Sequence, residues 1–411
     1  MDRSCIIAKS ASYEDNARDK MNELHFQHKT LAKKSQKPRV IIIYFPFKAF
    51  PPYKFLSEII KILMPITGQI TIIGGNTPRI VIPNGNVEIH DIQMGVHYLK
   101  EVKPWPYSLL LWMYKYILIQ KRTCDALIKA HNSGDIVLFY MAYPHFLLPL
   151  IISKILGKKT IEIITRSKPK TAIPKILSLQ DPILYNLLGG ISPESESIIT
   201  NLKLEKYQNK IKPIGARYID TSRYKILKPL NERKQLVGYV GRLNRDKGAI
   251  NFVQAINLIA SENSNVEYVI IGTGELYGDI LEECSKIKAT FNIPIDVMGF
   301  IPEEDLPKYL NELKLLILPT RHAEGVPTII LESMACGTPV LSSNVGGIPD
   351  VIVNEANGFY LNSDSPQDIA NSVIKILSQS NLSDISNNAR KVIEEKFSFK
   401  DAVKRYEKII N

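Results

Sequence analysis

Two glutamates lie in a segment whose residue types suit the binding of an anion flanked by hydroxyl groups. The segment 318–341 contains, in order, Glu324, Pro327, Glu332 and Gly337. It predicts a buried strand, a loop and a short helix, with Pro327 at the first helical position and Gly337 in the left-handed conformation after the helix. Glu324 would then lie in the loop, and Glu332 about one and a half turns inside the helix.

The start of this helix favours a negatively charged group, because backbone N–H groups and the positive end of the helix dipole point outward there. We expect these donors near Gly325, Val326, Thr328 and Ile329. A diphosphate bound to them would have a carboxylate on each side. The loop glutamate can accept hydrogen bonds from a sugar, and the helix glutamate from a ribose. Alternatively, the acids only complement the helix dipole.

Two turns that contain glycine place further groups at the ends of predicted strands. The turn within 237–248 carries Arg242 and Lys247, and a second turn carries Gly272 and Gly274. Open parallel sheets bind ligands at the edge where the strands end. Two cations at that edge can neutralise the charge that builds on a departing diphosphate. The alternatives are solvated loop charges for the first turn and a tight structural turn for the second.

The elements that position these residues alternate between short β-branched runs and longer helical stretches, which indicates parallel sheets. We expect strands in the first half at 40–44, 69–73, 87–92, 135–140, 160–165 and 211–214. We expect strands in the second half at 236–240, 268–271, 296–298, 315–318 and 340–342. Two such sets predict an α/β protein with two doubly wound, Rossmann-like domains.

The length of 411 residues suits two hydrophobic cores of this kind. The predicted parts are a polar extension (1–38), a first domain (39–215), a charged linker (216–234), a second domain (235–396) and a last helix (397–411). The spacing from Ser398 to Asp401 is that of a capping box, which would start the last helix. The extension is expected to be a solvated tail.

Charge is distributed unevenly along the chain. Residues 1–234 hold 36 lysines and arginines against 18 acidic residues, whereas residues 235–411 hold 16 against 23, so the halves carry +18 and −7. A basic half indicates an anionic partner. The four cysteines stand far apart without a CxxC pair, so neither a disulfide framework nor a zinc site is indicated. No apolar run has the length of a signal peptide or a membrane span.

Residues 235–361 resemble the family-four, group 1 retaining glycosyltransferases, which have the GT-B fold of two Rossmann-like domains. The resemblance rests on the Gly-Arg-Leu turn that ends at Gly248, the Gly-Thr-Gly-Glu turn, and Gly299-Phe300. It rests further on the two glutamates separated by seven residues, on Gly-Thr-Pro-Val and on Gly-Gly-Ile-Pro-Asp. The resemblance implies that the domains close by a hinge motion and that the last helix crosses back to the first domain.

By this resemblance, Arg242 and Lys247 bind the donor diphosphate, Glu332 the ribose, Glu324 the transferred sugar, and the backbone near Phe300 the base. The donor would be a UDP-, GDP- or ADP-sugar, transferred to an acceptor hydroxyl with retention of configuration. The family needs no metal ion or other cofactor. The chain accordingly contains no Asp-x-Asp triplet.

The first half departs from the family pattern. Arg166 follows Thr165 where the family commonly has a histidine, and it is either an acceptor-phosphate ligand or a surface arginine. Both tryptophans, Trp105 and Trp112, lie in an apolar stretch with lysines at its ends. This stretch suits a helix in a membrane interface, or one packed against the sheet. With the basic half beside it, the first alternative predicts a lipid-linked or phosphorylated acceptor at an anionic membrane surface.

Three other functions compete with transfer. A noncatalytic protein could retain the nucleotide-sugar pocket for sensing or scaffolding. A nucleotide-sugar epimerase shares the architecture, but it needs groups that remove a proton from the sugar. Nucleic-acid binding is suggested by a pI of about 9.2. However, the chain lacks a helix-turn-helix, finger or RNP signature. We therefore expect a cytoplasmic enzyme of glycan or glycolipid synthesis, peripheral to the membrane.

Overall fold

The computed structural model describes residues 37–44, 52–75, 86–92, 107–142, 146–165, 178–215, 217–263, 265–321 and 325–411. The predictions made for Glu324, Arg166 and Trp105, and for the extension up to residue 36, concern residues outside these ranges.

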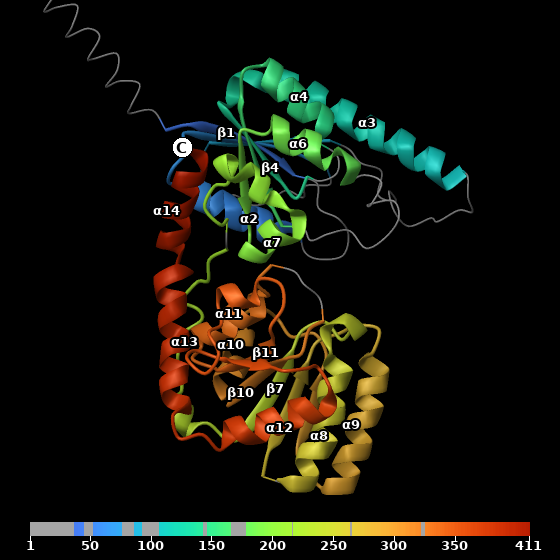
Figure 1. Ribbon diagram of the computed structural model, residues 1–411, viewed down its shortest axis with the longest axis vertical. Helices are drawn as coiled ribbons and strands as arrows, with labels where there is room; N and C mark the ends of the chain where they lie inside the picture. The colour runs from blue at the N-terminus through green and yellow to red at the C-terminus, as the bar shows by residue number, and fades with distance from the viewer. Residues whose placement is uncertain are drawn as a thin grey trace, which may run out of the picture.

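Two six-stranded parallel sheets form the centres of two domains (Figure 1). The first sheet contains β1 (Arg39–Tyr44), β2 (Gln69–Gly74), β3 (Val87–Asp91), β4 (Ile136–Tyr140), β5 (Lys159–Ile164) and β6 (Gly190–Pro193). The second contains β7 (Leu236–Val240), β8 (Glu267–Ile271), β9 (Ile295–Met298), β10 (Leu315–Leu318), β11 (Val340–Ser343) and β12 (Phe359–Leu361). Their orders, β3-β2-β1-β4-β5-β6 and β12-β11-β10-β7-β8-β9, are both Rossmann orders. The predicted α/β class with two doubly wound domains is confirmed.

Strand β1 shows why the first sheet needs helices on both faces. Side chains alternate along a strand, so a strand that is apolar at every position buries both of its faces. Ile41 and Ile43 belong to one hydrophobic cluster of the domain. Val40, Ile42 and Tyr44 belong to the other. The sheet is therefore the middle layer of three.

Helices from distant parts of the chain supply the outer layers of the first domain. One face is covered by α3 (Tyr107–Lys129), α4 (Leu147–Ile155), α6 (Asp181–Leu187) and α7 (Glu196–Leu202). The other is covered by α2 (Pro52–Leu63) and α14 (Phe399–Ile410). Helix α14 starts where the capping box was predicted, since Ser398 Oγ accepts a hydrogen bond from the Asp401 N–H. Figure 1 shows α13 and α14, in red, running from the second domain to the first.

The second domain has one continuous hydrophobic cluster around its sheet. Its helices are α8 (Ala249–Glu262), α9 (Tyr277–Phe291), α10 (Leu306–Glu312), α11 (Thr328–Ala335), α12 (Pro366–Leu377) and α13 (Leu382–Lys396). Because α11 directly follows the central strand β10, its first turn lies at the carboxyl edge of the sheet.

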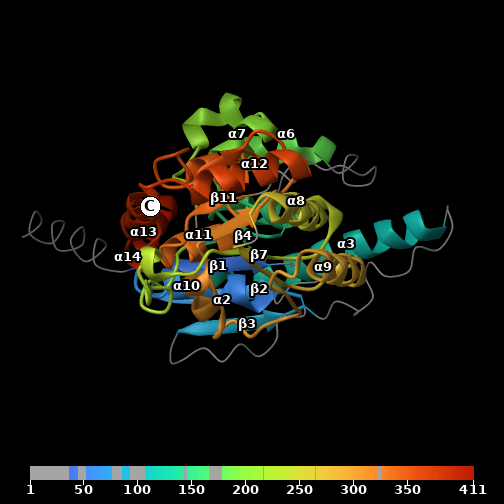
Figure 2. The same ribbon diagram turned by 90° about the horizontal axis from the view of Figure 1, so that it is seen from below.

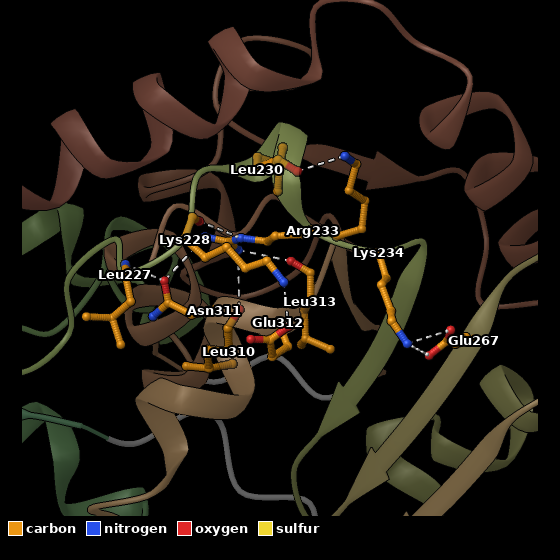
Figure 3. A network of polar contacts seen from close by, with 11 residues as sticks. Leu227, Lys228, Leu230, Arg233, Lys234, Glu267, Leu310, Asn311, Glu312 and Leu313 are labelled. Atoms are coloured by element: carbon orange, nitrogen blue, oxygen red, sulfur yellow. Dashed lines mark hydrogen bonds and ion pairs between the residues drawn. The ribbon is translucent and has the colours of Figure 1, made fainter.

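The segment predicted as a linker packs on the second domain over most of its length. Its apolar side chains Ile219, Tyr224 and Leu230 belong to that domain's cluster. Arg233, with only 4% of its surface exposed, donates hydrogen bonds to the carbonyl oxygens of Leu313 and Cys336 and to Thr338 Oγ1. Figure 3 shows this guanidinium among the backbone groups that surround it. The domain therefore fixes the chain well before β7 begins.

One predicted strand is wrong and two strands were not predicted. In place of a strand at 211–214, Ile211 forms a single bridge to Ile191, and the strand beside β5 is β6. Pro213 lacks the N–H group that a further ladder bond would need. The unpredicted strands are β6, which contains glycine and proline, and β12, which has three residues.

Helix α3 extends beyond the body of the first domain in two perpendicular views (Figures 1 and 2). It overlaps the stretch predicted to lie at a membrane interface. Its C-terminal half packs on the sheet through Ile119 and Leu127, of which only Ile119 belongs to that stretch. Within the described ranges, no helix has both the length and the apolar character needed to cross a membrane.

Candidate functional site

The turns after β7 and β8 pack closely together. Gly272 has a φ of +146°, and a Cβ atom on it would lie 1.9 Å from the Gly241 carbonyl oxygen. A Cβ atom on Gly274 would lie 2.5 Å from the Leu243 carbonyl oxygen. Only glycine fits such close approaches of two backbones. These glycines therefore define the turn that carries Arg242 at the carboxyl edge of the sheet.

Helix α11 begins at Thr328, and no side chain in the described ranges caps its N-terminus. Pro327 precedes the helix as the N-cap residue, with a ψ of 126°. The prediction that Pro327 occupies the first helical position is therefore wrong by one residue, because this ψ is not helical. After the helix, Gly337 has a φ of +67°, as predicted. The short helix thus presents its first turn to the sheet edge.

A cavity of about 440 Å³ lies where these turns and α11 meet. Most of its lining comes from the ends of β7, β8 and β9 and from α11, and one side chain comes from the first domain. The lining residues are Phe55, Val240, Gly241, Arg242, Ile271, Gly272, Thr273, Phe300, Ile301, Glu303, Leu306, Thr328, Ile329 and Glu332. The cavity opens at the carboxyl edge of the second sheet, which is where ligands bind in this architecture.

The structure brings six of the predicted site residues together around this cavity. They are Arg242, Gly272, Phe300, Thr328, Ile329 and Glu332. Phe300 has 82% of its surface exposed, which leaves its ring free to pack on a flat ligand. Thr328 and Glu332, four residues apart in α11, lie on one face of the helix.

The other predicted residues in the described ranges lie outside the cavity lining. Lys247 is 8% exposed and ends a short 3₁₀ helix beyond Arg242. Gly325 and Val326 face the first domain: Val326 and Glu194 line a separate cavity of about 400 Å³. Gly325 and Val326 therefore form part of the contact between the domains.

Glu332 is almost fully buried, with 5% of its surface exposed. The hydroxyl group of Tyr224 donates a hydrogen bond of 3.1 Å to its Oε1 atom. Burial raises the pKa of Tyr224, and the charge of Glu332 raises it further, so the phenol remains a donor at neutral pH. Tyr224 thereby fixes the orientation of the carboxylate.

A second, more polar cavity of about 320 Å³ adjoins the first. Glu303, Thr328 and Glu332 line both cavities. Ser57, Glu58 and Lys61 of α2 line only the second, together with the interdomain residues Tyr218, Ile219, Asp220, Arg223 and Tyr224. The start of α11 is therefore enclosed by the first domain and the interdomain segment as well as by its own domain.

The chemistry of the site is that of an anion pocket with a carboxylate on one side. Arg242 supplies a permanent positive charge, and the first turn of α11 supplies a positive dipole end. Among the described residues, no three histidine, cysteine, aspartate or glutamate side chains are grouped so that they could hold a metal ion. These features suit a phosphate group with a hydroxyl-bearing ring beside Glu332.

Residues 221–392 match the family model described as "Glycosyl transferases group 1". This part of the chain is similar to the group 1 glycosyl transferases. The cavity at the start of α11 lies largely inside the group 1 domain, and Phe55 is its contribution from outside.

Curated relatives of the group 1 domain carry related names. The chain is 28% identical over 59% of its length to the uncharacterized glycosyltransferase MJ1607 of Methanocaldococcus jannaschii, of which 58% is covered. It is 31% identical over 40% of its length to the capsular polysaccharide biosynthesis glycosyltransferase CapM of Staphylococcus aureus, of which 42% is covered. The chain thus spans about half the length of these relatives.

Solved structures resemble this chain over both of its domains. Anabaena Alr3699/HepE, crystallised with UDP and glucose, is 15% identical, with a TM-score of 0.63 over 90% of this chain and 98% of that one. At this identity the likeness concerns the fold. The GT-B fold that the sequence implied is confirmed.

Sequence reasoning missed the residues around the site that lie before or far from the donor motifs. Tyr224 lies just inside the group 1 match, and Phe55 lies in α2 of the other domain. Neither stands in a motif. For Tyr224, the local signal was the presence of two tyrosines in the charged segment 216–234, and that segment was interpreted as a linker.

Proposed function

We propose that the protein transfers a sugar from a nucleotide-diphosphate sugar to an acceptor hydroxyl, with retention of configuration and without a metal ion. The observation that carries this proposal is the cavity at the start of α11, where Arg242 and the buried Glu332 line one pocket of a group 1 domain. The relatives named glycosyltransferases and the neighbour crystallised with UDP and glucose support it.

In this proposal the donor diphosphate binds at the first turn of α11, near Thr328 and Ile329, with Arg242 opposite. Glu332 accepts hydrogen bonds from the ribose, and the base packs near Phe300. Arg242 and Lys247 stabilise the negative charge that builds on the leaving diphosphate. Such stabilisation contributes about 3 to 4 kcal/mol where a single donor has been removed from comparable sites.

The transfer step needs little acid–base chemistry from the protein. The acceptor hydroxyl attacks the sugar from the side of the leaving group, and a phosphate oxygen takes its proton. The carbon–oxygen bond to the diphosphate breaks as the new glycosidic bond forms, so configuration is retained. Glu324 would bind the transferred sugar. The enzyme contributes orientation and fixed charge, which suits a site closed by two domains.

A nucleotide panel tests the donor half of this proposal. UDP, GDP, ADP and their sugars are added to the wild-type protein and to Glu332→Ala in thermal-shift assays. We expect one base class to raise the melting temperature of the wild type, and the substitution to abolish the shift. No shift with any nucleotide would contradict the proposal. Binding without hydrolysis or transfer would instead support a noncatalytic nucleotide-sugar-binding protein.

For the acceptor, we propose a lipid-linked or phosphorylated molecule at an anionic membrane surface. Large apolar side chains are exposed on α3, on α4 and around α6, and α4 packs on both α3 and α6. They are Met113, Tyr114, Ile117, Ile128, Leu148, Ile151, Ile155, Leu179 and Ile183. The exposed basic residues Lys121, Arg122 and Lys129 lie on α3, and Lys154 lies on α4. Apolar and basic side chains together favour binding to anionic lipid.

Flotation with vesicles of anionic and of neutral lipid tests this surface. The wild type should float with anionic vesicles at low salt, and the double change Ile155→Glu and Leu179→Glu should reduce flotation. Leu281→Glu on α9 of the second domain, also exposed, is the matched control. The proposal fails if the wild type does not bind, or if all three proteins float equally.

A further inference from the structure

Arg217 lies between the two domains and contacts both. Its guanidinium carbon lies 3.6 Å from the centre of the Phe55 ring of α2. Its Nη1 atom donates a hydrogen bond of 3.2 Å to Thr328 Oγ1, at the first residue of α11. Its Nε atom lies 4.0 Å from Oε1 of Glu194, which directly follows β6. One side chain therefore joins two elements of the first domain to the start of α11.

These contacts form part of a wider junction between the domains. The backbone N–H group of Glu196, at the start of α7, donates a hydrogen bond of 2.8 Å to Asp350 of the second domain. Ser195 packs so closely on Gly347 that a Cβ atom there would lie 2.9 Å from the Ser195 Cβ. The Arg217 contacts differ from these because they end on Thr328 and Phe55, which both line the donor cavity.

We propose that Arg217 is a positioning residue that holds the two domains in the closed arrangement, with Phe55 against the start of α11. This inference rests on the proposed function, because it assigns the closed arrangement to the transfer step. Arg217 does not itself line the cavity. Its role is therefore to place Phe55 and Thr328, and not to bind the donor.

The geometry requires arginine in particular. A planar guanidinium can stack on a ring with its face while its edge donates hydrogen bonds in several directions. A lysine ammonium group carries the same charge but has no flat face and no rigid fork. Arg217→Lys should therefore retain the attraction to Glu194 and lose the simultaneous contacts with Phe55 and Thr328.

The ion pair between Arg217 and Glu194 keeps the closure of the two domains reversible. The Glu194 side chain is only 10% exposed, and its Oε1 atom has no hydrogen-bond partner among the described residues. Burial raises the pKa of Glu194, and the charge of Arg217 lowers it in part. Removing a carboxylate from water is costly, and a single ion pair offsets that cost incompletely. The closed state is then only weakly favoured, so that a ligand can shift the balance between open and closed.

Small-angle X-ray scattering of the full chain tests this role. The variants are Arg217→Gln with Glu194→Gln, which leaves no unpaired buried charge, and Arg217→Lys. Arg39→Gln is the control, because Arg39 pairs with Asp135 at 2.8 Å within the first domain. We expect a larger radius of gyration for the double variant, an intermediate one for Arg217→Lys and no change for the control. Equal radii for all four proteins would overturn the inference.

Kinetics separate a positioning role from a structural one. In the double variant, the Kd for the nucleotide that binds best among UDP, GDP and ADP should stay within about twofold of wild type. The kcat for hydrolysis of UDP-glucose, GDP-mannose or ADP-glucose should fall by about tenfold or more. An unchanged kcat in an opened variant would contradict the inference. If no nucleotide binds the wild type, the proposed function fails, whereas scattering still decides the role of Arg217.

Discussion

The two sheets share one strand order but differ in the connections at the carboxyl ends of their strands. In the second sheet, β7 and β8 end in turns that contain Gly241 and Gly272, and these turns surround a cavity. In the first sheet, β6 ends in the Glu194–Glu196 turn, which is used for contact with the other domain. The two sheets thus have the same strand order but different functions. The polar side chains that distinguish them lie in the connections that follow the strands.

A substitution in the donor cavity of the second domain should have the largest effect on turnover. Arg242→Ala removes the cation that lines the cavity, and we expect kcat to fall by about 10² to 10³-fold. Nucleotide binding should weaken less, because the first turn of α11 and Glu332 remain. The measurement is turnover at saturating donor, with and without EDTA, and EDTA should change neither rate.

Arg39→Ala is the control for this change, since it removes an exposed arginine of the first domain that pairs with Asp135. Its turnover should equal that of the wild type. A less than fivefold effect of Arg242→Ala would show that the second sheet does not hold the charge-stabilising group.

A substitution in the second domain should lower the unfolding free energy of that domain without affecting the first domain. Arg233→Met leaves the carbonyl oxygens of Leu313 and Cys336 without their donor, so the second domain should lose about 3 kcal/mol of unfolding free energy. Both tryptophans of the chain lie in the first half, so tryptophan fluorescence reports on the first domain. We expect circular dichroism to show an early denaturant transition that fluorescence does not follow.

Lys234→Met is the matched control for Arg233 (Figure 3). Lys234 is exposed and pairs with Glu267 at 3.2 Å, and such a pair contributes less than about 1 kcal/mol. If both substitutions destabilise the protein equally, the interdomain segment is not held by the buried guanidinium.

The framework could be predicted from the sequence because it depends on local patterns. Continuous β-branched runs identified most strands, and the spacing from Ser398 to Asp401 identified the start of the last helix. Strand β6 was missed because its residues Gly190–Pro193 include glycine and proline, and its place is set by pairing with β5. Local propensity says little about such a strand.

The site was predictable to the extent that it follows strand ends. Arg242, Gly272 and Glu332 stand in motifs beside predicted strands or helices, and the structure gathers them around one cavity. Arg217 and Tyr224 act through contacts with residues more than 100 positions away. Neither periodicity nor spacing within one segment carries such information, so a charged segment appeared to be a linker.

A smaller effect should distinguish the glycines of the donor turns from an ordinary glycine. At Gly272 a Cβ atom would meet the backbone of Gly241, and the positive φ adds strain, so Gly272→Ala should cost about 2 kcal/mol or more. Gly278 lies in the first turn of α9 with nothing within 4 Å of a Cβ atom, so Gly278→Ala should be neutral or slightly stabilising. Thermal unfolding measures both. Equal effects would mean that the close turn is not required.

The smallest expected effect concerns the link between the interdomain segment and the donor site. Tyr224→Phe removes the hydroxyl group that donates to Glu332 and keeps the ring in the core. A hydrogen bond to a carboxylate contributes about 1 to 2 kcal/mol, so the Kd for the bound nucleotide should rise by about five- to thirtyfold.

Tyr268→Phe provides the control for this loss, because the Tyr268 hydroxyl is buried in the same domain and has no hydrogen-bond partner within the part of the chain that the structure describes. Removing it leaves no group unsatisfied, so nucleotide affinity should be unchanged and stability equal or higher. Calorimetric titration of both variants gives the two dissociation constants. If Tyr224→Phe binds nucleotide as the wild type does, the orientation of Glu332 comes from α11 alone. The segment before β7 would then serve the junction between the domains through Arg217, without reaching the donor site through Tyr224.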